Sequence, residues 1–360
     1  MITNVICSLL LVFAYLSFYI NPEYTTFFSF IGLGFPFALF TNIFFFIYWL
    51  YKRNKYFFIS LLTLIAGFYH TSRFVQFTLW SSDAPENTTS LKIMSYNVRL
   101  FDLYNWTKNE KTRDQILTFL KEEDSDIICF QEYYYTTGNH FDTRDTLIQL
   151  LDSKHYFEHF TTKVKESKKN NNYSNFGSAI YSKFPIINSG VVNFENDHTN
   201  NCIYVDLQRE EDTIRVFNAH LGSIRFQSED YDYIGGKGNP IKEGQKPAEQ
   251  KILGRLAIGF KKRVSQSNTV LKEIENSPYP VIVCTDMNDT PISYSYSQFS
   301  SVLNDAFTIS GSGIGGTYIG NYPFLRIDYI WYDDYFNSCN FVTHQQELSD
   351  HKAVSCTVYN

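Results

Sequence analysis

The segment VIVCTDMNDTP (residues 281–291) sets an apolar run directly against a cluster of polar residues. The four apolar residues predict a buried β-strand, and Asp286 and Asn288 follow at its end. A carboxylate is costly to bury unless it is paired or bound to a metal. The same letters also suit an ordinary turn. The segment therefore predicts either a strand that delivers polar groups to a functional site or a simple turn.

Other apolar runs carry polar residues at or near their ends. Asn97 lies in LKIMSYNV (91–98), Glu132 ends DIICFQE (126–132), Asn218 and His220 lie in TIRVFNAHL (213–221), Asp328 lies in RIDYIWY (326–332), and Asp350 and His351 precede KAVSCTVY (352–359). Taken alone, each has a plain explanation as a turn residue or a solvated charge. Together they predict acids and amides that converge at one rim, where oxygen ligands suit Mg²⁺ or Mn²⁺.

The remaining patterns define the fold class. Further strands are expected at FGSAIYS (176–182) and NCIYVDLQ (201–208), and helices at 109–123, 142–152 and about 247–276. The polar or Gly-rich segments 163–175 and 225–248 are expected to be loops. Many strands with few helices between them predict an α+β fold of two β-sheets packed face to face, with helices outside.

The soluble part of the chain resembles a known superfamily. The ordered blocks are SYNVRLFD, IICFQE, NFGSAIYSKFPI, FNAHL, VIVCTDMNDTP, RIDYIW and SDHKAV. They resemble the endonuclease/exonuclease/phosphatase superfamily, which includes pancreatic deoxyribonuclease, abasic-site endonucleases, inositol polyphosphate 5-phosphatases and neutral sphingomyelinases. The resemblance covers residues 91–360 and implies a four-layered α/β sandwich. It also implies a phosphoric ester hydrolase that depends on Mg²⁺, with Mn²⁺ as the other candidate.

The resemblance implies a catalytic role for residues near the C-terminus. Asp286 resembles the acid that orients or deprotonates the attacking water, and Asn288 resembles its partner near the scissile phosphate. His351 is similar to the histidine that contacts the phosphate, and Asp328 to the acid that orients it and keeps it charged. Many members have Gly-Asp-Phe-Asn where this chain has Thr285-Asp286-Met287-Asn288, so both functional positions are kept.

The other candidate residues complete the implied site. Glu132 resembles the metal-binding glutamate of the superfamily, Asn97 a residue that helps to hold the metal and water, and Asp350 a further metal-site residue. Asn218 and His220 match the Asn-x-His block that contacts phosphate in many members.

Three apolar runs precede this domain. Residues 1–20 and 24–51 carry no charge, and a shorter run, 56–72, can continue past Arg73 through FVQFTLW (74–80). Because a helix needs about 20 apolar residues to span a bilayer, we expect three transmembrane helices in residues 1–80. A linker at 81–90 and the catalytic domain at 91–360 follow. A cleaved signal peptide at 1–20 and buried core helices are the alternatives.

Loop charge predicts the orientation of these helices. The first loop, NPEYTT (21–26), has no Lys or Arg, whereas YKRNK (51–55) has three. The positive-inside rule puts the basic loop in the cytoplasm. We therefore expect an integral protein of a bacterial inner membrane, with its catalytic domain on the extracytoplasmic side.

Charge also bears on the substrate. Residues 1–85 contain 4 of the 31 basic and 2 of the 37 acidic residues, so 86–360 carry a net charge of 27 − 35 = −8. An acidic domain repels polyanions, which favours a lipid or small phosphoester over a nucleic acid. A tethered nuclease remains the second hypothesis, with Arg225, Lys237, Lys242 and the Lys163–Lys169 cluster as its basic residues. A non-catalytic binding module is the third, and no protein partner can be inferred.

Overall fold

A computed structural model of the chain describes residues 1–77, 83–137, 141–151, 155–166, 172–195, 197–210, 212–224, 248–320 and 325–360. These residues form two compact units. Unit 1 comprises Met1–Tyr69, Gly222–Asn268 and Ile292–Ser297, and unit 2 comprises His70–Leu221, Thr269–Pro291 and Gln298–Asn360.

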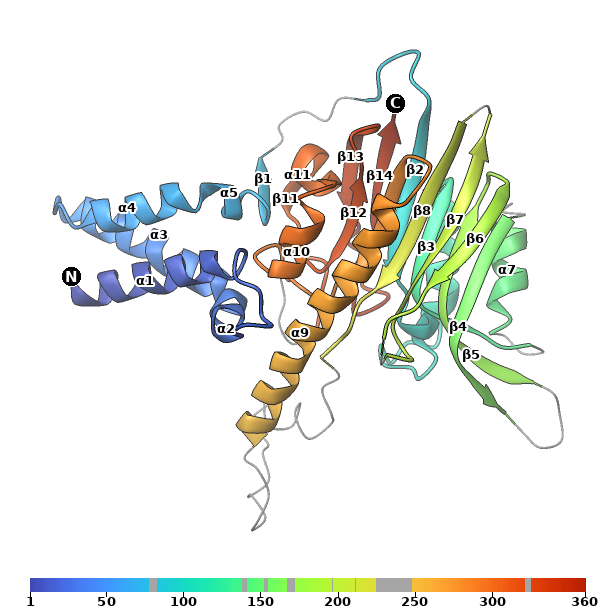
Figure 1. Cartoon of the computed structure of the whole chain (residues 1–360), viewed down its shortest axis with the longest axis horizontal. Coiled ribbons are helices and arrows are strands. Elements are labelled where there is room, and N and C mark those ends of the chain that lie inside the picture. Colours follow the sequence, from blue (N-terminus) through green and yellow to red (C-terminus); the bar gives the residue numbers. More distant parts are fainter. Residues whose placement is uncertain are drawn as a thin grey trace, which may run out of the picture. The chain divides into compact units, whose positions relative to one another are not determined.

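Unit 2 is built on two six-stranded sheets (Figure 1). The first has the order β13 (Asn337–Thr343), β14 (Val354–Tyr359), β2 (Ser90–Asn97), β3 (Ile127–Tyr135), β5 (Tyr173–Ser182) and β4 (His155–Lys165). The second has the order β10 (Asn304–Asp305), β12 (Asp328–Tyr332), β9 (Val281–Asp286), β8 (Asp212–His220), β7 (Asn201–Arg209) and β6 (Ile186–Val192). A small sheet pairs β1 (Val75–Phe77) with β11 (Ser312–Ile314).

The two large sheets share one pattern of strand directions. The central pair of each is parallel, β2 with β3 in the first and β8 with β9 in the second. The other neighbouring strands are antiparallel. Parallel neighbours end at the same edge of a sheet, so each sheet brings two strand ends together. These are the strands whose ends carry polar residues in the sequence.

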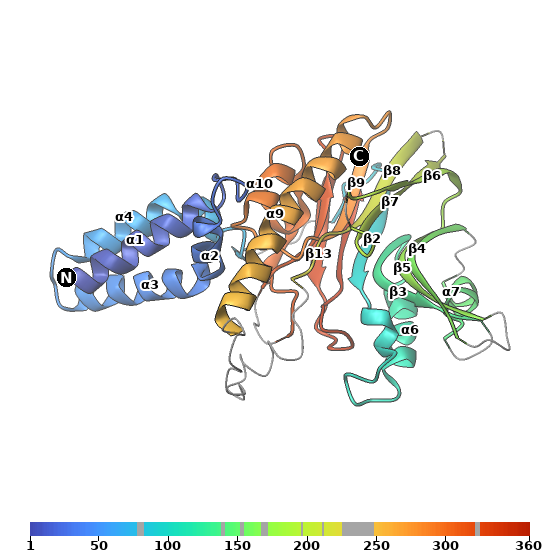
Figure 2. The same ribbon diagram turned by 60° about the horizontal axis from the view of Figure 1, so that its bottom comes forward.

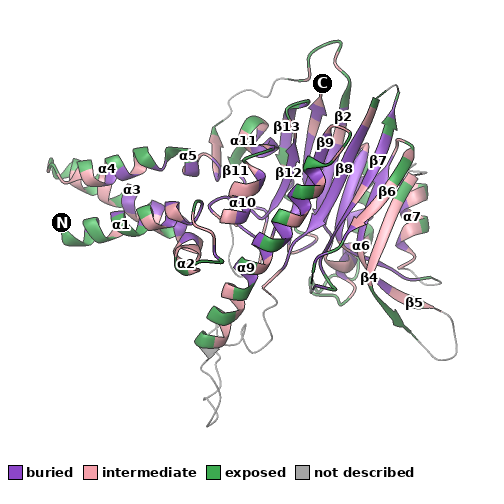
Figure 3. Cartoon of the chain, in the orientation of Figure 1, coloured by how far each residue is buried: buried purple, intermediate pink, exposed green. Residues whose placement is uncertain are grey.

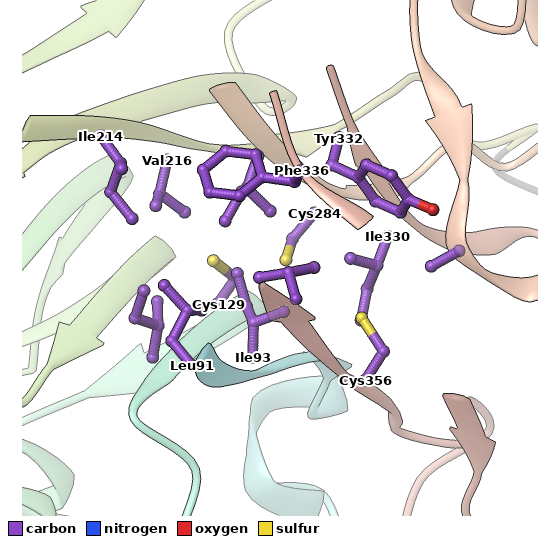
Figure 4. Close-up of a cluster of buried hydrophobic side chains, with 14 of the residues drawn as sticks. Leu91, Ile93, Cys129, Ile214, Val216, Cys284, Ile330, Tyr332, Phe336 and Cys356 are labelled. Atoms are coloured by element: carbon purple, nitrogen blue, oxygen red, sulfur yellow. The ribbon is translucent and has the colours of Figure 1, made fainter. Parts of the chain in front are cut away.

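Apolar side chains from both sheets fill the space between them (Figure 4). Ile93 and Cys129 come from the first sheet, and Val216, Cys284 and Ile330 from the second, all fully buried. Burying one such aliphatic side chain stabilises the fold by about 1.5–3 kcal/mol. The six cysteines are free thiols. Two packed mixed sheets with flanking helices confirm the predicted α+β sandwich.

Helices cover the outer face of the first sheet. Ile116 and Leu120 of α6 (Thr112–Glu123) and Leu147 of α7 (Thr143–Leu150) are buried against residues such as Phe130 and Tyr181. Figure 3 shows the buried and exposed sides of these elements. The remaining helices in or entering unit 2 are η1 (Arg99–Asp102), α9 (Ala248–Glu275), α10 (Tyr294–Phe299) and α11 (Ala306–Ser310).

Unit 1 contains the apolar helices of the N-terminal region. They are α1 (Ile2–Leu16), α2 (Phe27–Leu33), α3 (Phe35–Tyr51) and α4 (Phe57–Ala66), followed by α5 (Phe68–Thr71) at the boundary. Helices α1, α3 and α4 lie side by side in Figures 1 and 2 and contact one another. Between α2 and α3 the chain bends by 64° at Gly34. Pro36 stands in the first turn of α3, where its missing N–H leaves no helical hydrogen bond unmade.

The α1, α3 and α4 bundle has polar groups inside and apolar groups outside. Ser8 donates to Asn42 Oδ1 at 2.8 Å, and Ser60 donates to Asn4 Oδ1 at 2.7 Å. These four polar side chains are buried. The outward side chains are large and apolar and include Phe40, Phe44 and Leu62, at 68%, 60% and 64% exposure. This is the reverse of the pattern of a water-soluble helix bundle.

The helices are shorter than the apolar runs that contain them. Among the described residues, none is by itself both long and apolar enough to cross a bilayer, whereas the bent pair α2 and α3 reaches the required length and composition together. The expected continuation of the third span through residues 74–80 is wrong over its described part. There α5 ends at Thr71 and β1 forms at Val75–Phe77, because its backbone groups pair with β11.

Asn218 joins the two sheets from the inside. On β8, its amide nitrogen donates to Phe130 O on β3 at 2.8 Å and to Ala179 O on β5 at 3.0 Å. Its oxygen accepts from Gln131 Nε2 at 2.8 Å. With no exposed surface, Asn218 has no side-chain atom left for a substrate. The predicted phosphate contact of Asn218 is therefore wrong in this structure, and its role is to hold the sheets together.

We expect Asn218→Ala to lower the free energy of unfolding by about 2–4 kcal/mol, because it leaves buried carbonyls without donors and opens a cavity. The measurement is the melting temperature of the purified full-length chain in detergent. Asn337→Ala, at an exposed position on β13, is the matched control and should leave the melting temperature unchanged. Equal melting temperatures for Asn218→Ala and the control would contradict the bridging role.

Candidate active site

The candidate site lies where the central strands of both sheets end. Asn97 ends β2, Glu132 lies near the end of β3, His220 ends β8 and Asp286 ends β9. Asp328 begins β12 directly opposite Asp286, and the segment before β14 carries Asp350 and His351. Opposite sheets meet here, since His220 Nε2 lies 4.0 Å from Glu132 Oε1.

Asp286 is the buried centre of the site. Its Oδ2 accepts from Asn97 Nδ2 at 2.9 Å, and its Oδ1 accepts from the backbone N–H of Asn288 at 3.0 Å. Burial raises the pKa of Asp286, and the charges of His351 and His220 act in the opposite direction. A carboxylate with a raised pKa is a better proton acceptor, which suits activation of a water molecule.

Asp328 and His351 form a hydrogen-bonded pair. His351 Nδ1 lies 3.1 Å and 3.0 Å from the two carboxylate oxygens of Asp328. Its other ring nitrogen, Nε2, lies 3.9 Å from Asp286 Oδ2. Burial alone lowers the pKa of His351, but the charges of Asp328 and Asp286 and the hydrogen bond to Asp328 raise it well above its ordinary value. The two carboxylates therefore favour the protonated form of His351.

Glu132 reaches the site through a bulge in β3. The register with β5 shifts between Phe130 and Tyr133, and Glu132 has a φ of +48°. Left-handed backbone is uncommon for a glutamate, and such positions cluster at functional sites. Its side chain remains 37% exposed, so its carboxylate is accessible from solvent.

Asp350 and Asn288 are held at the rim of the site. The Ser349 hydroxyl donates to Asn97 O at 2.8 Å and accepts from the backbone N–H of His351 at 3.2 Å, which fixes the segment to β2. Asp350 Oδ2 lies 3.4 Å from Arg99 Nε. Asn288 Nδ2 donates to Leu221 O at 3.1 Å, so this amide ties β9 to the end of β8.

The arrangement fits a hard divalent cation. His220 Nε2 is buried without a hydrogen bond, although it lies 3.5 Å from Asp286 Oδ2 and 4.0 Å from Glu132 Oε1. The carboxylates of Glu132 and Asp286 and the amide of Asn97 are oxygen donors of the kind that Mg²⁺ binds. Asp286, Asp328 and His351 also offer atoms within 4.8 Å of one another. His351 Nδ1 is already paired with Asp328, and Asp286 Oδ2 with Asn97 Nδ2, whereas the carboxylate of Glu132 has no hydrogen bond among the described residues. Glu132, Asn97 and Asp350 therefore stay the predicted metal-site residues.

Eight of the nine predicted site residues line this region, and Asn218 lies behind it in the core. The structure adds Arg99, Gln131 and Ser349, which the sequence blocks contain without marking them out. Among the predicted basic residues, Arg225, Lys237, Lys242 and residues 167–169 lie outside the described residues.

A separate cavity of about 470 Å³ is lined by Thr137, Lys163, Tyr173 and Asn175, and includes none of the nine predicted site residues.

The two packed sheets form a fold of the hydrolases of the nuclease and phosphatase type. The chain belongs to the endonuclease/exonuclease/phosphatase family, whose sequence profile matches residues 94–351. A second profile, described as a domain of unknown function (DUF8431), matches residues 1–74. A comparison with curated proteins finds no match.

Solved structures share the fold at low identity. An endonuclease/exonuclease/phosphatase from Beutenbergia cavernae DSM 12333 has 17% identity and a TM-score of 0.54, over 75% of this chain and 71% of its own. A family protein from Bacteroides thetaiotaomicron has 17% identity and a TM-score of 0.53, over 76% and 98%. The mannosyl-6-phosphatase of Bacteroides thetaiotaomicron VPI-5482 has 16% identity and a TM-score of 0.51, over 74% and 99%.

We expect His351 to remain protonated through neutral pH and Asp328→Asn to lower its pKa, because burial remains while the attracting charge is lost. The measurement is an NMR titration of ¹³C-labelled histidine rings in EDTA, with His351→Gln identifying the signal. A His351 signal that titrates at the ordinary value in the wild type, or that is unmoved by Asp328→Asn, would refute the cationic pair.

Proposed function

We propose that this protein is a membrane-anchored, metal-dependent phosphohydrolase that cleaves a phosphodiester by attack of an activated water molecule. The observation that carries this proposal is that Asp328 bonds to His351, whose other ring nitrogen faces Asp286. Glu132 and His220 lie beside this group. It combines a buried carboxylate and a buried histidine, and the pKa of each is raised.

Each group has a defined part in the reaction. Asp286 orients the attacking water and accepts its proton, while Asn97 keeps the carboxylate in place. Protonated His351 donates from Nε2 to a phosphoryl oxygen, and Asp328 holds its ring. His220 contributes a second donor beside Asp286. A bound Mg²⁺ supplies further positive charge and lowers the pKa of water.

The reversed pattern of unit 1 supports membrane anchoring. Exposing Phe40, Phe44 and Leu62 to lipid chains costs little free energy, whereas exposing them to water is unfavourable. Hydrogen bonds such as Ser8 to Asn42 would keep polar groups away from lipid. We propose that these helices embed in a bacterial inner membrane, with YKRNK (51–55) in the cytoplasm and the catalytic domain on the extracytoplasmic side.

The substrate we favour is a lipid or a small phosphoester. A membrane anchor brings the site close to lipid headgroups, and the net charge of −8 in residues 86–360 opposes polyanions. Cleavage of DNA or RNA by a tethered nuclease is the competing outcome. A purely binding role is disfavoured because Glu132, Asp286 and His351 are all present at one site.

We expect Mg²⁺-dependent hydrolysis that EDTA abolishes, and a loss of at least about 100-fold in kcat for Asp286→Ala and for His351→Ala. The measurement uses the full-length chain in detergent with bis-p-nitrophenyl phosphate, single- and double-stranded DNA, RNA, sphingomyelin and phosphoinositides. Asp334→Ala, which removes an exposed acid from a surface turn, is the control and should keep full activity. If the folded protein turned over none of these substrates, the proposed hydrolase activity would be wrong and a binding module would be favoured.

Membrane topology gives a separate test. In a Cys7→Ser background, a cysteine replacing Tyr51 next to the basic loop should resist an impermeant maleimide in spheroplasts until they are permeabilised. A cysteine replacing exposed Glu110 in unit 2 should react at once, because we propose that it faces the outside. The opposite labelling pattern would reverse the orientation, and release of the chain by alkali would exclude an integral anchor.

A further inference from the structure

The loop that follows Asn97 has an unusual backbone. Four consecutive residues, Arg99 to Asp102, have φ values of +43°, +57°, +56° and +58°. L-residues avoid this left-handed region, and a run of four is costly. Such strain persists where surrounding contacts impose it, and it is concentrated at functional sites.

Contacts on both sides hold the loop in this shape. Phe101 is fully buried, with ring centroids 6.0 Å from Phe130 and 5.7 Å from Tyr133. The buried Asp102 carboxylate accepts hydrogen bonds from the backbone N–H of Thr107, at 3.3 Å, and from its hydroxyl. The loop is therefore fixed by packing and hydrogen bonds directly after Asn97.

Three contacts fix the position of Arg99. Its backbone N–H donates to Asn97 Oδ1 at 3.0 Å, and its Nε lies 3.4 Å from Asp350 Oδ2. The guanidinium carbon lies 4.4 Å from the ring centroid of Trp106, so the indole covers one face of the cation. Asn97 and Asp350 each neighbour a residue that we assign to the reaction, so Arg99 stands at the rim of the site.

The outer edge of the guanidinium has no partner in the described part of the chain. No hydrogen bond involves either Nη atom of Arg99, and its side chain is 31% exposed. Those two nitrogens form a planar fork that matches the oxygens of a phosphate or carboxylate. Asp350 and Trp106 hold the fork in one orientation, which lowers the entropy lost on binding an anion.

We propose that Arg99 binds a second phosphate of the substrate, next to the phosphate that reacts. In the proposed reaction, His351 and His220 beside Asp286 donate to the reacting phosphate, so we assign the Arg99 fork to a neighbouring anionic group. Tyr104 and Trp106 are 61% and 40% exposed, and their ring centroids lie 5.0 Å apart, so an aromatic surface flanks the fork. This inference rests on the proposed phosphohydrolase function and narrows its substrates to those with two phosphates.

The test is a binding measurement that needs no turnover. Calorimetry on the full-length protein in detergent, at fixed free Mg²⁺, compares fructose 6-phosphate with fructose 1,6-bisphosphate, which differ by one phosphate. We expect the bisphosphate to bind the wild type about tenfold or more tightly, and Arg99→Gln to abolish that preference. Arg99→Lys should keep part of it, because the charge remains and the fork is lost.

Two further variants test whether the preference for the bisphosphate comes from the Arg99 guanidinium or from positive charge in general. Lys108→Gln removes an exposed cation from the same loop and should leave the preference intact. Trp106→Leu keeps an apolar residue but removes the stacked ring, and should weaken bisphosphate binding more than monophosphate binding. Melting temperatures of all variants show whether each is folded.

The outcomes also distinguish this inference from the proposed function. If the wild type hydrolyses bis-p-nitrophenyl phosphate but lacks a preference for the bisphosphate, or keeps it in folded Arg99→Gln and Arg99→Lys, the second-phosphate site is wrong and the hydrolase stands. If the wild type binds neither sugar phosphate and hydrolyses nothing, both proposals fail.

Discussion

The packing of two sheets, each with one central parallel pair, is the constraint on which the site depends. Parallel neighbours end at the same edge, so β2 and β3 present Asn97 and Glu132 while β8 and β9 present His220 and Asp286. The apolar core between the sheets then sets the distance across which these groups face one another. The 4.0 Å separation between His220 Nε2 and Glu132 Oε1 is a result of that packing.

Much of this architecture could be predicted from sequence because its strands are buried and their ends are polar. The runs at 91–98, 126–132 and 279–286 correspond to β2, β3 and β9. The strands β4, β6 and β13 were not predicted. They lie at or next to sheet edges, where one side meets solvent, so polar residues interrupt the apolar pattern.

The site was harder to predict in detail, because the sequence does not show how deeply each side chain is buried. Asn218 and His220 are two residues apart and lie on the same face of β8, yet Asn218 bonds within the core while His220 reaches the rim. Nor does the string SYNVRLFD reveal four left-handed residues, since none of them is glycine. In unit 1, apolar composition predicted helices but not their lengths, which depend on breaks such as Gly34 and Gly67.

The bridge from Gln131 through Asn218 to the carbonyls of β3 and β5 has a consequence for how the protein loses activity. No single sheet contains a complete set of reactive groups, because Glu132 on the first sheet approaches His220 on the second, and Asn97 on the first sheet bonds to Asp286 on the second. A fluctuation that parts the sheets therefore dismantles the site and hydrates the core in the same event. Backbone amides beneath the site should exchange with solvent at the rate at which the whole two-sheet core opens. Unit 2 therefore loses its active site and its folded core together.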